Sequence, residues 1–241
     1  MTFFDEQVAA RYDEACGELN EPAVLEPTVA CLADLAGSGR ALEFAIGTGR
    51  VALPLAAAGV DVHGLEISQP MVDQLRTKPG GDHIPVTIGD MATTRVEGEF
   101  ALVYLVYNTI ENLLTQEEQV RCFQNAAAHL TPDGCFLIEV AVPNLRRLPP
   151  GETHVPFDLS PDHLGIDEFD VVNQRLVSHH YWVGAGEARA FHSEHRYAWP
   201  AEYDLMARLA GMELAARWSD WHRDPFTAES GSHISVWRPS G

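Results

Sequence analysis

Short apolar runs alternate with amphipathic segments through the middle of the chain. Runs with few polar positions predict buried strands, because strands covered on both faces lose the alternation of half-exposed ones. These runs cover residues 40–46, 60–66, 84–88, 100–107 and 135–142. Helices are predicted between them, and Ser68 and a capping box at Thr115–Glu118 mark two helix starts. Strand–helix units in series predict a parallel, doubly wound α/β sheet.

The two ends of the chain carry different patterns. Residues 3–36 predict two helices, and residues 143–170, rich in Pro, Gly, Asp and Glu, predict a loop. Period-two segments at 171–183 and 189–198 predict two strands. After them come a helix from Pro200 and a last antiparallel pair at 212–221 and 231–238. The expected fold is a mostly parallel, seven-stranded, Rossmann-like sheet with an antiparallel flap inserted after strand five.

Three parts of the chain follow from this pattern. Residues 1–36 are expected to form a helical cap. Residues 37–142 and 199–241 are expected to form a Rossmann-like domain that binds the ligand, because ligands of such sheets lie beyond the carboxyl ends of the strands. Residues 143–198 are expected to cover the second substrate as a flap.

Composition narrows the partners. The 241 residues carry a formal net charge of −19, which would repel nucleic acid and anionic membranes. The four cysteines form no C-x-x-C pair, so free, mostly buried thiols are expected. We expect a cytoplasmic protein, because neither a signal peptide nor a run of eighteen apolar residues is visible.

The strongest motif is the glycine turn after the first predicted strand, Gly47-Thr48-Gly49-Arg50. Glycines let a ligand approach the backbone, and the helix start that follows favours an anionic or zwitterionic group. With Glu66 about twenty residues on, the turn formally fits a nicotinamide dinucleotide. Two details favour S-adenosylmethionine instead: Glu43 would oppose a pyrophosphate but accept an ammonium, and Asp90-Met91 follows strand three where an adenine would lie.

Together these motifs, which recur in register over residues 40–142, resemble the class I S-adenosylmethionine-dependent methyltransferases. The Pro132-Asp133-Gly134 turn before strand five belongs to the same pattern. The resemblance implies that Glu43 and the backbone of Gly47 and Gly49 hold the methionine end, with Ala45 where a first glycine is usual. It implies that Glu66, followed by Ile67, binds the ribose, that Asp90 binds the adenine amino group and that Met91 packs on its ring. The residues that it places around the methyl group are Leu105, Val106 and Tyr107, with Tyr12 closing the site.

Histidines are concentrated in the predicted flap. A hydroxyl or ammonium acceptor must lose a proton, and histidine titrates near neutrality. Candidates for this base are His179, His180 and His195, together with Tyr107, and period two puts His179 and His180 on opposite strand faces. Asn108 and Glu111 follow strand four as polar groups at the pocket mouth, where Glu111 could bind a cationic acceptor or act as base. No metal is expected, because no tight histidine spacing occurs.

The sequence therefore predicts methyl transfer from S-adenosylmethionine, with S-adenosylhomocysteine as product, to an oxygen or nitrogen of a small molecule, expected to be a specialised metabolite. Two alternatives stay open: an NAD(P)-dependent oxidoreductase on the same sheet, and a cofactor-binding protein with a cyclase or regulatory role. The expected protein is a monomer or homodimer that binds neither nucleic acid nor membrane.

Overall fold

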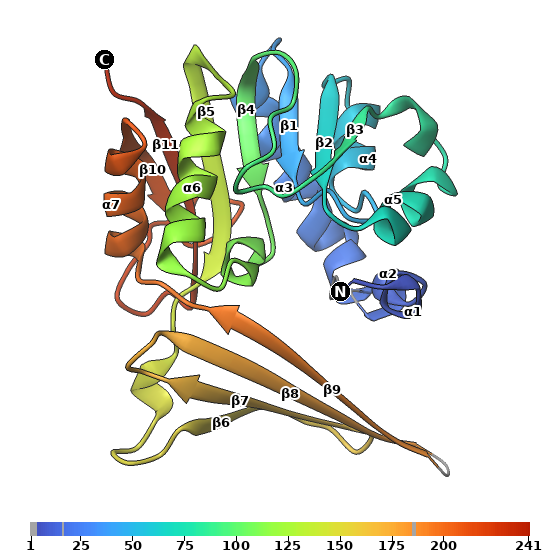
Figure 1. The fold of residues 1–241 in the computed structure, drawn as a ribbon, viewed down its shortest axis with the longest axis vertical. Coiled ribbons are helices and arrows are strands. Elements are labelled where there is room, and N and C mark those ends of the chain that lie inside the picture. The colour runs from blue at the N-terminus through green and yellow to red at the C-terminus, as the bar shows by residue number, and fades with distance from the viewer. Residues whose placement is uncertain (1–3, 16, 185–186) are drawn as a thin grey trace.

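Two sheets of different size form the framework (Figure 1). A computed structural model describes residues 4–15, 17–184 and 187–241 of the chain. The large sheet has the order β10-β11-β5-β4-β1-β2-β3, and β1 to β5 run parallel. Only β11 runs antiparallel to both of its neighbours. The strands of this sheet are β1 (Ala41–Phe44), β2 (Val62–Glu66), β3 (Val86–Ile88), β4 (Phe100–Leu105), β5 (Leu130–Ala141), β10 (Met212–Trp218) and β11 (Ser232–Pro239). The predicted doubly wound, mostly parallel sheet is confirmed.

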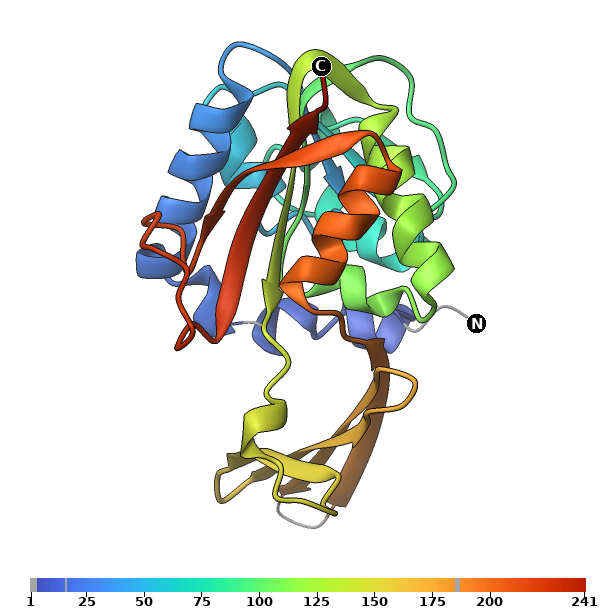
Figure 2. The same ribbon diagram turned by 90° about the vertical axis from the view of Figure 1, so that its left-hand side faces the viewer.

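Helices cover both faces of the large sheet. In Figure 2, α3 (Pro22–Ala36) lies on one side, and α6 (Gln116–Ala127) and α7 (Pro200–Leu209) lie on the other. The first side is completed by α4 (Ala52–Ala57), which packs on α3 and β2. Crossovers that alternate between the faces leave the carboxyl ends of the parallel strands open, which is where such folds bind ligands.

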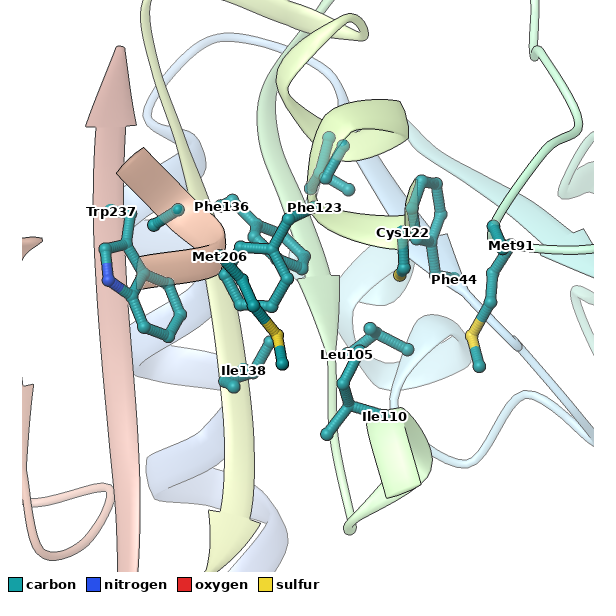
Figure 3. Packing of buried hydrophobic residues seen from close by; sticks show 14 of the residues in the cluster. Phe44, Met91, Leu105, Ile110, Cys122, Phe123, Phe136, Ile138, Met206 and Trp237 are labelled. Atoms are coloured by element: carbon teal, nitrogen blue, oxygen red, sulfur yellow. The ribbon is translucent and has the colours of Figure 1, made fainter. Parts of the chain in front are cut away.

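A separate hydrophobic core lies on each face of the sheet. Successive strand residues point to opposite faces, so Val103 and Leu105 of β4 belong to the core on the α6 side. Their neighbours Leu102 and Tyr104 belong to the core on the α3 side. Aromatic rings fill the α6 side, where Phe123 packs edge-on against Phe136 at 5.0 Å and Trp237 at 5.2 Å (Figure 3).

Two predicted helix starts are present. The Ser68 hydroxyl accepts a hydrogen bond from the Met71 amide at the start of α5 (Gln69–Arg76). At α6, the Thr115 hydroxyl accepts from the Glu118 amide, and the Glu118 carboxylate accepts in return from the Thr115 amide. Each cap satisfies backbone amides that have no partner within the helix.

A small antiparallel sheet follows β5 and precedes α7. It consists of β6 (His154–Leu159), β7 (His163–Asp170), β8 (Arg175–Gly184) and β9 (Glu187–Arg196), paired in that order. Figures 1 and 2 show it beyond the carboxyl ends of the large sheet. The predicted inserted flap is confirmed, but the predicted loop over 143–170 is wrong, because β6 and β7 lie inside it. Polar side chains on the exposed face, and Pro156 at a register shift, mask the strand pattern.

The N-terminal segment is less regular than predicted. Instead of one helix before residue 21, it has the short helices α1 (Glu6–Ala9) and α2 (Tyr12–Ala15) and a 3-10 turn (Gly17–Asn20). The second predicted helix is present as α3. Residues 1–3 and Cys16 lie outside the described residues. The described cysteines, Cys31, Cys122 and Cys135, are free and buried. No helix in the described part of the chain is long and apolar enough to cross a membrane.

Candidate functional site

A cavity of about 670 Å³ lies between the carboxyl end of the large sheet and the small sheet. The loops after β1, β2 and β3 line one half, and the loop after β4 and the inner face of the small sheet line the other. Many residues that the sequence singled out line it: Tyr12, Ala45, Gly47, Glu66, Ile67, Asp90, Met91, Tyr107, Asn108, Glu111, His180 and His195. Glu43, Gly49, Leu105 and His179 are not among the lining residues.

Glu66 organises the half of the cavity that the loops after β1, β2 and β3 line, where the resemblance places the cofactor (the cofactor half). It ends β2 and is only 4% exposed. One carboxylate oxygen accepts a hydrogen bond from the Gly47 amide and the other from the Ser68 amide, both at 2.9 Å. Burial raises the pKa of Glu66, and these amides oppose that rise. The carboxylate thereby joins the glycine turn to the α5 start and keeps further lone pairs for a ligand.

The turn after β1 has left-handed backbone at Ala45 (φ +53°), Gly47 (φ +57°) and Gly49 (φ +80°). The alanine in place of a first glycine therefore carries some strain, which proteins tend to retain at functional sites. A methyl group added at Gly47 would lie 3.3 Å from the flexible end of Met71, whereas one at Gly49 would lie 2.3 Å from Leu75 in the core. Gly47 thus borders the cavity and Gly49 closes the packing behind it.

Glu43 lies beside the cavity on β1. Its carboxyl accepts a hydrogen bond from the Tyr104 hydroxyl at 2.9 Å, and the residue is 3% exposed. Burial raises the pKa of Glu43 to about 8, while the Tyr104 bond and the Arg50 charge act in the opposite direction. A backbone hydrogen bond from Ala52, at the start of α4, has the same lowering effect. In this structure Glu43 therefore ties β1, β4 and α4 together.

Asp90 and Met91 follow β3 as predicted. Asp90 lines the cavity, and one of its oxygens accepts a hydrogen bond from the Ala92 amide at 2.7 Å. Met91 is 9% exposed and belongs to the α6-side core. Leu105, which the resemblance placed near the methyl group, is 1% exposed within that same core, as Figure 3 shows. Of these side chains, Met91 and Asp90 line the cavity and offer an adenine ring an apolar surface with one polar edge.

The N-terminal segment is fastened over the cofactor half. The Asp13 carboxylate accepts a hydrogen bond from the Thr48 hydroxyl at 2.6 Å and pairs with the Lys78 ammonium at 2.6 Å. The Ser68 hydroxyl also donates to the Phe4 carbonyl at 2.6 Å. These contacts place Tyr12, next to Asp13, in the cavity wall. The sequence pointed to Tyr12 but not to the Asp13 anchor.

Tyr107 and Asn108 form the link between the two halves. Both have left-handed backbone, at φ +55° and +58°. The Glu139 carboxylate on β5 accepts from the Tyr107 amide at 2.9 Å, and the Asn108 side-chain oxygen accepts from the Ala141 amide at 2.7 Å. Asn108 therefore holds the loop after β4 against β5, and Tyr107, 43% exposed, projects at the cavity edge.

Two carboxyl groups meet the second half of the cavity from opposite sides. Glu111 lies in the 3-10 turn Thr109–Asn112 and is 7% exposed, and Asp167 lies on β7. Burial raises the pKa of Glu111 to about 8, and the Asp167 charge adds to the rise. Burial also raises the pKa of Asp167, which accepts a hydrogen bond from the Ser178 hydroxyl at 2.7 Å. Asp167 was missed because the sequence predicted a loop there; the alternation of Leu164 and Ile166 before it was the available strand signal.

The small sheet divides the predicted histidines between its faces. His180 and His195 line the cavity, and burial lowers the pKa of His195 to about 4. The His195 Nε2 atom is 2.8 Å from the Ser193 hydroxyl, whereas its buried Nδ1 has no hydrogen-bond partner among the described residues. His179 points to the outer face, where it contacts Glu168 at 3.0 Å and His192 at 2.8 Å. The structure therefore does not bring His179 to the other candidates, because strand residues alternate in direction.

Because Glu111 is buried, the free energy of unfolding is expected to depend on pH. A folded-state pKa of about 8, above the ordinary 4.5, means that its stabilising contribution is complete below 4.5 and is lost as the pH rises through 8. We expect Glu111→Gln to become more stable than the parent protein by at least about 1.4 kcal/mol at pH 9. Urea unfolding at pH 5 and pH 9 checks this, and an equal difference at both pH values would contradict it.

Among the residues that the structure describes, no group of three His, Cys, Asp or Glu side chains is arranged to hold an ion. The cofactor half has three features that suit an adenosyl amino acid. The backbone is left-handed at Gly47, where no side chain blocks a ligand. Glu66 offers a buried carboxylate, and Asp90 offers an acid beside apolar groups.

The chain is similar in sequence and in structure to known methyltransferases. Residues 41–134 match the family model described as a methyltransferase domain. The chain is 28% identical over 236 residues to the cypemycin N-terminal methyltransferase of Streptomyces sp, covering 97% of this chain and 96% of that one. It is 37% identical to the solved CcbJ methyltransferase from Streptomyces caelestis, with a TM-score of 0.89 and coverage of 100% and 99%.

A second solved structure extends the likeness of fold alone. The S-adenosylmethionine-bound amino pentose methyltransferase from Micromonospora echinaspora has a TM-score of 0.67 at 21% identity, with 98% of each chain covered. These likenesses remove the nicotinamide-dependent alternative. The chain belongs to the class I S-adenosylmethionine-dependent methyltransferases.

Proposed function

We propose that the protein methylates an amine nitrogen of a small specialised metabolite. The observation that carries this proposal is the set of acidic side chains in the cavity wall. Five carboxyl groups line it, and no lysine or arginine does so among the described residues. These acids are Glu66, Asp90, Glu111, Glu118 and Asp167. A cationic acceptor complements such a wall, whereas an anionic one would be repelled.

Three residues would hold the cofactor in the first half. Glu66 would bind the ribose hydroxyls, Asp90 the adenine amino group, and the Gly47 turn the methionine end. S-adenosylmethionine supplies a methyl group already activated on a sulfonium, so the protein's task is to orient the acceptor and remove a proton. Ala45, Ile67, Met91 and Tyr12 would form the remaining surface around it.

The acceptor would lie against Glu111 and Asp167. No hydrogen bond from a described residue reaches the Glu111 carboxyl, so an ammonium there would satisfy a buried acid. The same ammonium would lower the pKa of Glu111, because a nearby positive charge favours the ionised form. The N-terminal segment and the small sheet would close the cavity from two sides, which excludes water from the reaction.

The relatives support nitrogen as the attacking atom. The cypemycin enzyme, at 28% identity, is named for methylation at an N terminus, and the enzyme from Micromonospora echinaspora is named for an amino pentose. Both names describe acceptors that carry an amine. The two named acceptors therefore share an amine nitrogen, and a small molecule that carries an amine would fit the acidic cavity wall of this chain.

Glu111→Gln tests the acceptor site. We expect kcat/KM for an amine acceptor to fall about 10²-fold, because a charge-assisted hydrogen bond contributes roughly 1.5–3 kcal/mol. Affinity for S-adenosylhomocysteine should be unchanged. The measurement is transfer of a labelled methyl group to matched pairs of small molecules that differ only in an amine or a hydroxyl.

Glu117→Gln is the matched control, because this exposed acid on α6 pairs only with Arg121 among the described residues. Label appearing in the hydroxyl member alone would contradict the proposal. Tight cofactor binding with no transfer to any amine would instead favour the non-methylating alternative.

A further inference from the structure

A chain of three side chains connects the cavity with the protein surface. The Asp158 carboxylate is 2.6 Å from His163 Nδ1, and His163 Nε2 is 3.0 Å from His180 Nδ1. His180 lines the cavity. At the other end, the Asp158 side chain is 38% exposed, whereas that of His163 is 15% exposed. We propose that Asp158, His163 and His180 form a relay that carries the acceptor's proton out of the cavity; this rests on the proposed amine methylation.

Hydrogen-bond chemistry fixes the direction of the chain. An ionised carboxylate only accepts, so Asp158 requires a proton on His163 Nδ1. Neutral His163 then has a lone pair on Nε2, which accepts from His180 Nδ1. His180 therefore carries its own lone pair on Nε2. The described residues provide no hydrogen-bond partner for that atom, which leaves it available to the acceptor.

Local structure holds the three residues in line. A register shift between Pro156 and Asp158 lets the neighbours Phe157 and Asp158 both contact His163. The His163 and His180 rings are nearly parallel, 19° apart with their centroids at 5.2 Å, which suits the hydrogen bond between their nitrogens. The Trp182 ring stacks on both, at 4.9 Å from His163 and 5.5 Å from His180. Packed rings restrict rotation, so the hydrogen bonds persist without further ordering.

The surrounding charges suit a neutral base. Burial, and then the His163 ring, lower the pKa of His180, and the Asp158 charge opposes them. His179 on the same strand and His192 on β9 also lower it. His195 on β9 and Asp167 on β7 line the cavity from the same face of the small sheet as His180, and the Glu111 carboxyl lines it from the loop after β4. Asp158 itself has a lowered pKa, chiefly through its hydrogen bond with His163.

The proton balance is complete without another reactant. The acceptor nitrogen forms a bond to the methyl carbon as the carbon–sulfur bond breaks, and the electron pair of that bond stays on sulfur. The nitrogen then carries one excess proton, which passes to His180 Nε2. His180 Nδ1 passes its proton to His163 Nε2, and His163 Nδ1 passes its proton to Asp158 and on to water. His180 is the catalytic residue of this relay, and Asp158 and His163 are positioning residues.

Asp158→Asn tests the relay. The amide can donate to His163 Nδ1 and so stabilise the opposite tautomer, which would put a proton on His180 Nε2. We expect kcat to fall about 10²-fold, the usual effect of losing a general base. KM for S-adenosylmethionine should not change, and the low-pH limb of the kcat profile should disappear. Asp162→Asn, which removes an exposed acid nearby, should behave as the parent protein.

Nitrogen NMR of the histidine rings gives a second readout in the resting protein. We expect His180 to be protonated on Nδ1 in the parent protein and on Nε2 in Asp158→Asn. A parent His180 protonated on Nε2, or an unchanged kcat profile in Asp158→Asn, would overturn the relay. Because this spectrum needs no acceptor, it decides the relay even if no amine is methylated. Loss of the low-pH limb in His195→Gln but not in Asp158→Asn would assign the proton to His195 and also overturn it.

Discussion

Glu66→Ala is expected to weaken binding of S-adenosylhomocysteine about 10³-fold, because two charge-assisted hydrogen bonds to the ribose would be lost. The Gly47 and Ser68 amides would lose their shared acceptor as well, so the turn that faces the ligand would no longer be held in place. Isothermal titration calorimetry measures the affinity, and circular dichroism checks that the variant is folded.

Two further variants make this result specific. Glu66→Gln keeps the size of the side chain but lacks the second acceptor oxygen, so an intermediate loss is expected. Glu97→Ala removes an exposed acid from the loop before β4 and should bind as the parent protein does. Parent-like affinity in a folded Glu66→Ala protein would contradict the ribose role.

Gly49→Ala is expected to destabilise the protein by about 3 kcal/mol, through left-handed strain and an overpacked core. Its backbone lies at φ +80°, and an added methyl group would meet Leu75 at 2.3 Å and Leu53 at 3.2 Å. Leu75 belongs to the core on the α3 side of the sheet and Leu53 packs against it, so neither can move without disturbing that core.

Gly47→Ala is the matched comparison, because the nearest side chain that the same change meets there is the flexible end of Met71 at 3.3 Å. We expect this variant to lose about 1 kcal/mol of stability and to bind the cofactor less well, because Gly47 lines the cavity. Thermal unfolding of both variants measures the two losses of stability. Equal losses of stability would show that the two glycines do not have the separate roles described above.

The large sheet could be predicted from sequence because its signals are local. Buried parallel strands leave uninterrupted apolar runs, as at Phe100–Leu105, and helix starts leave short polar motifs such as the one at Thr115. Strands β6 and β7 of the small sheet were missed because their local signals are weak. β6 and β7 each expose one face, and the register shift after Pro156 breaks the alternation that would have revealed them.

A residue of the candidate site could be predicted only where the sequence also indicates the direction in which its side chain points. Glu66 and Asp90 end or follow strands, where most directions lead to the carboxyl edge. Glu43 and Leu105 lie within strands, where tertiary packing decides between the cavity and the core. Asp167 and Asp158 come from strands that were not foreseen, so no local signal could connect them with Glu111 or His180.

A crystal structure with S-adenosylhomocysteine bound would show whether one cavity holds the cofactor at Glu66 and leaves the Glu111 half for the acceptor. We expect ribose hydroxyls within hydrogen-bond distance of Glu66, adenine beside Asp90 and Met91, and the sulfur directed toward the Glu111 half. Adenine bound among Glu111, His180 and His195 instead, with Glu66 contacting only the Gly47 and Ser68 amides, would contradict this arrangement.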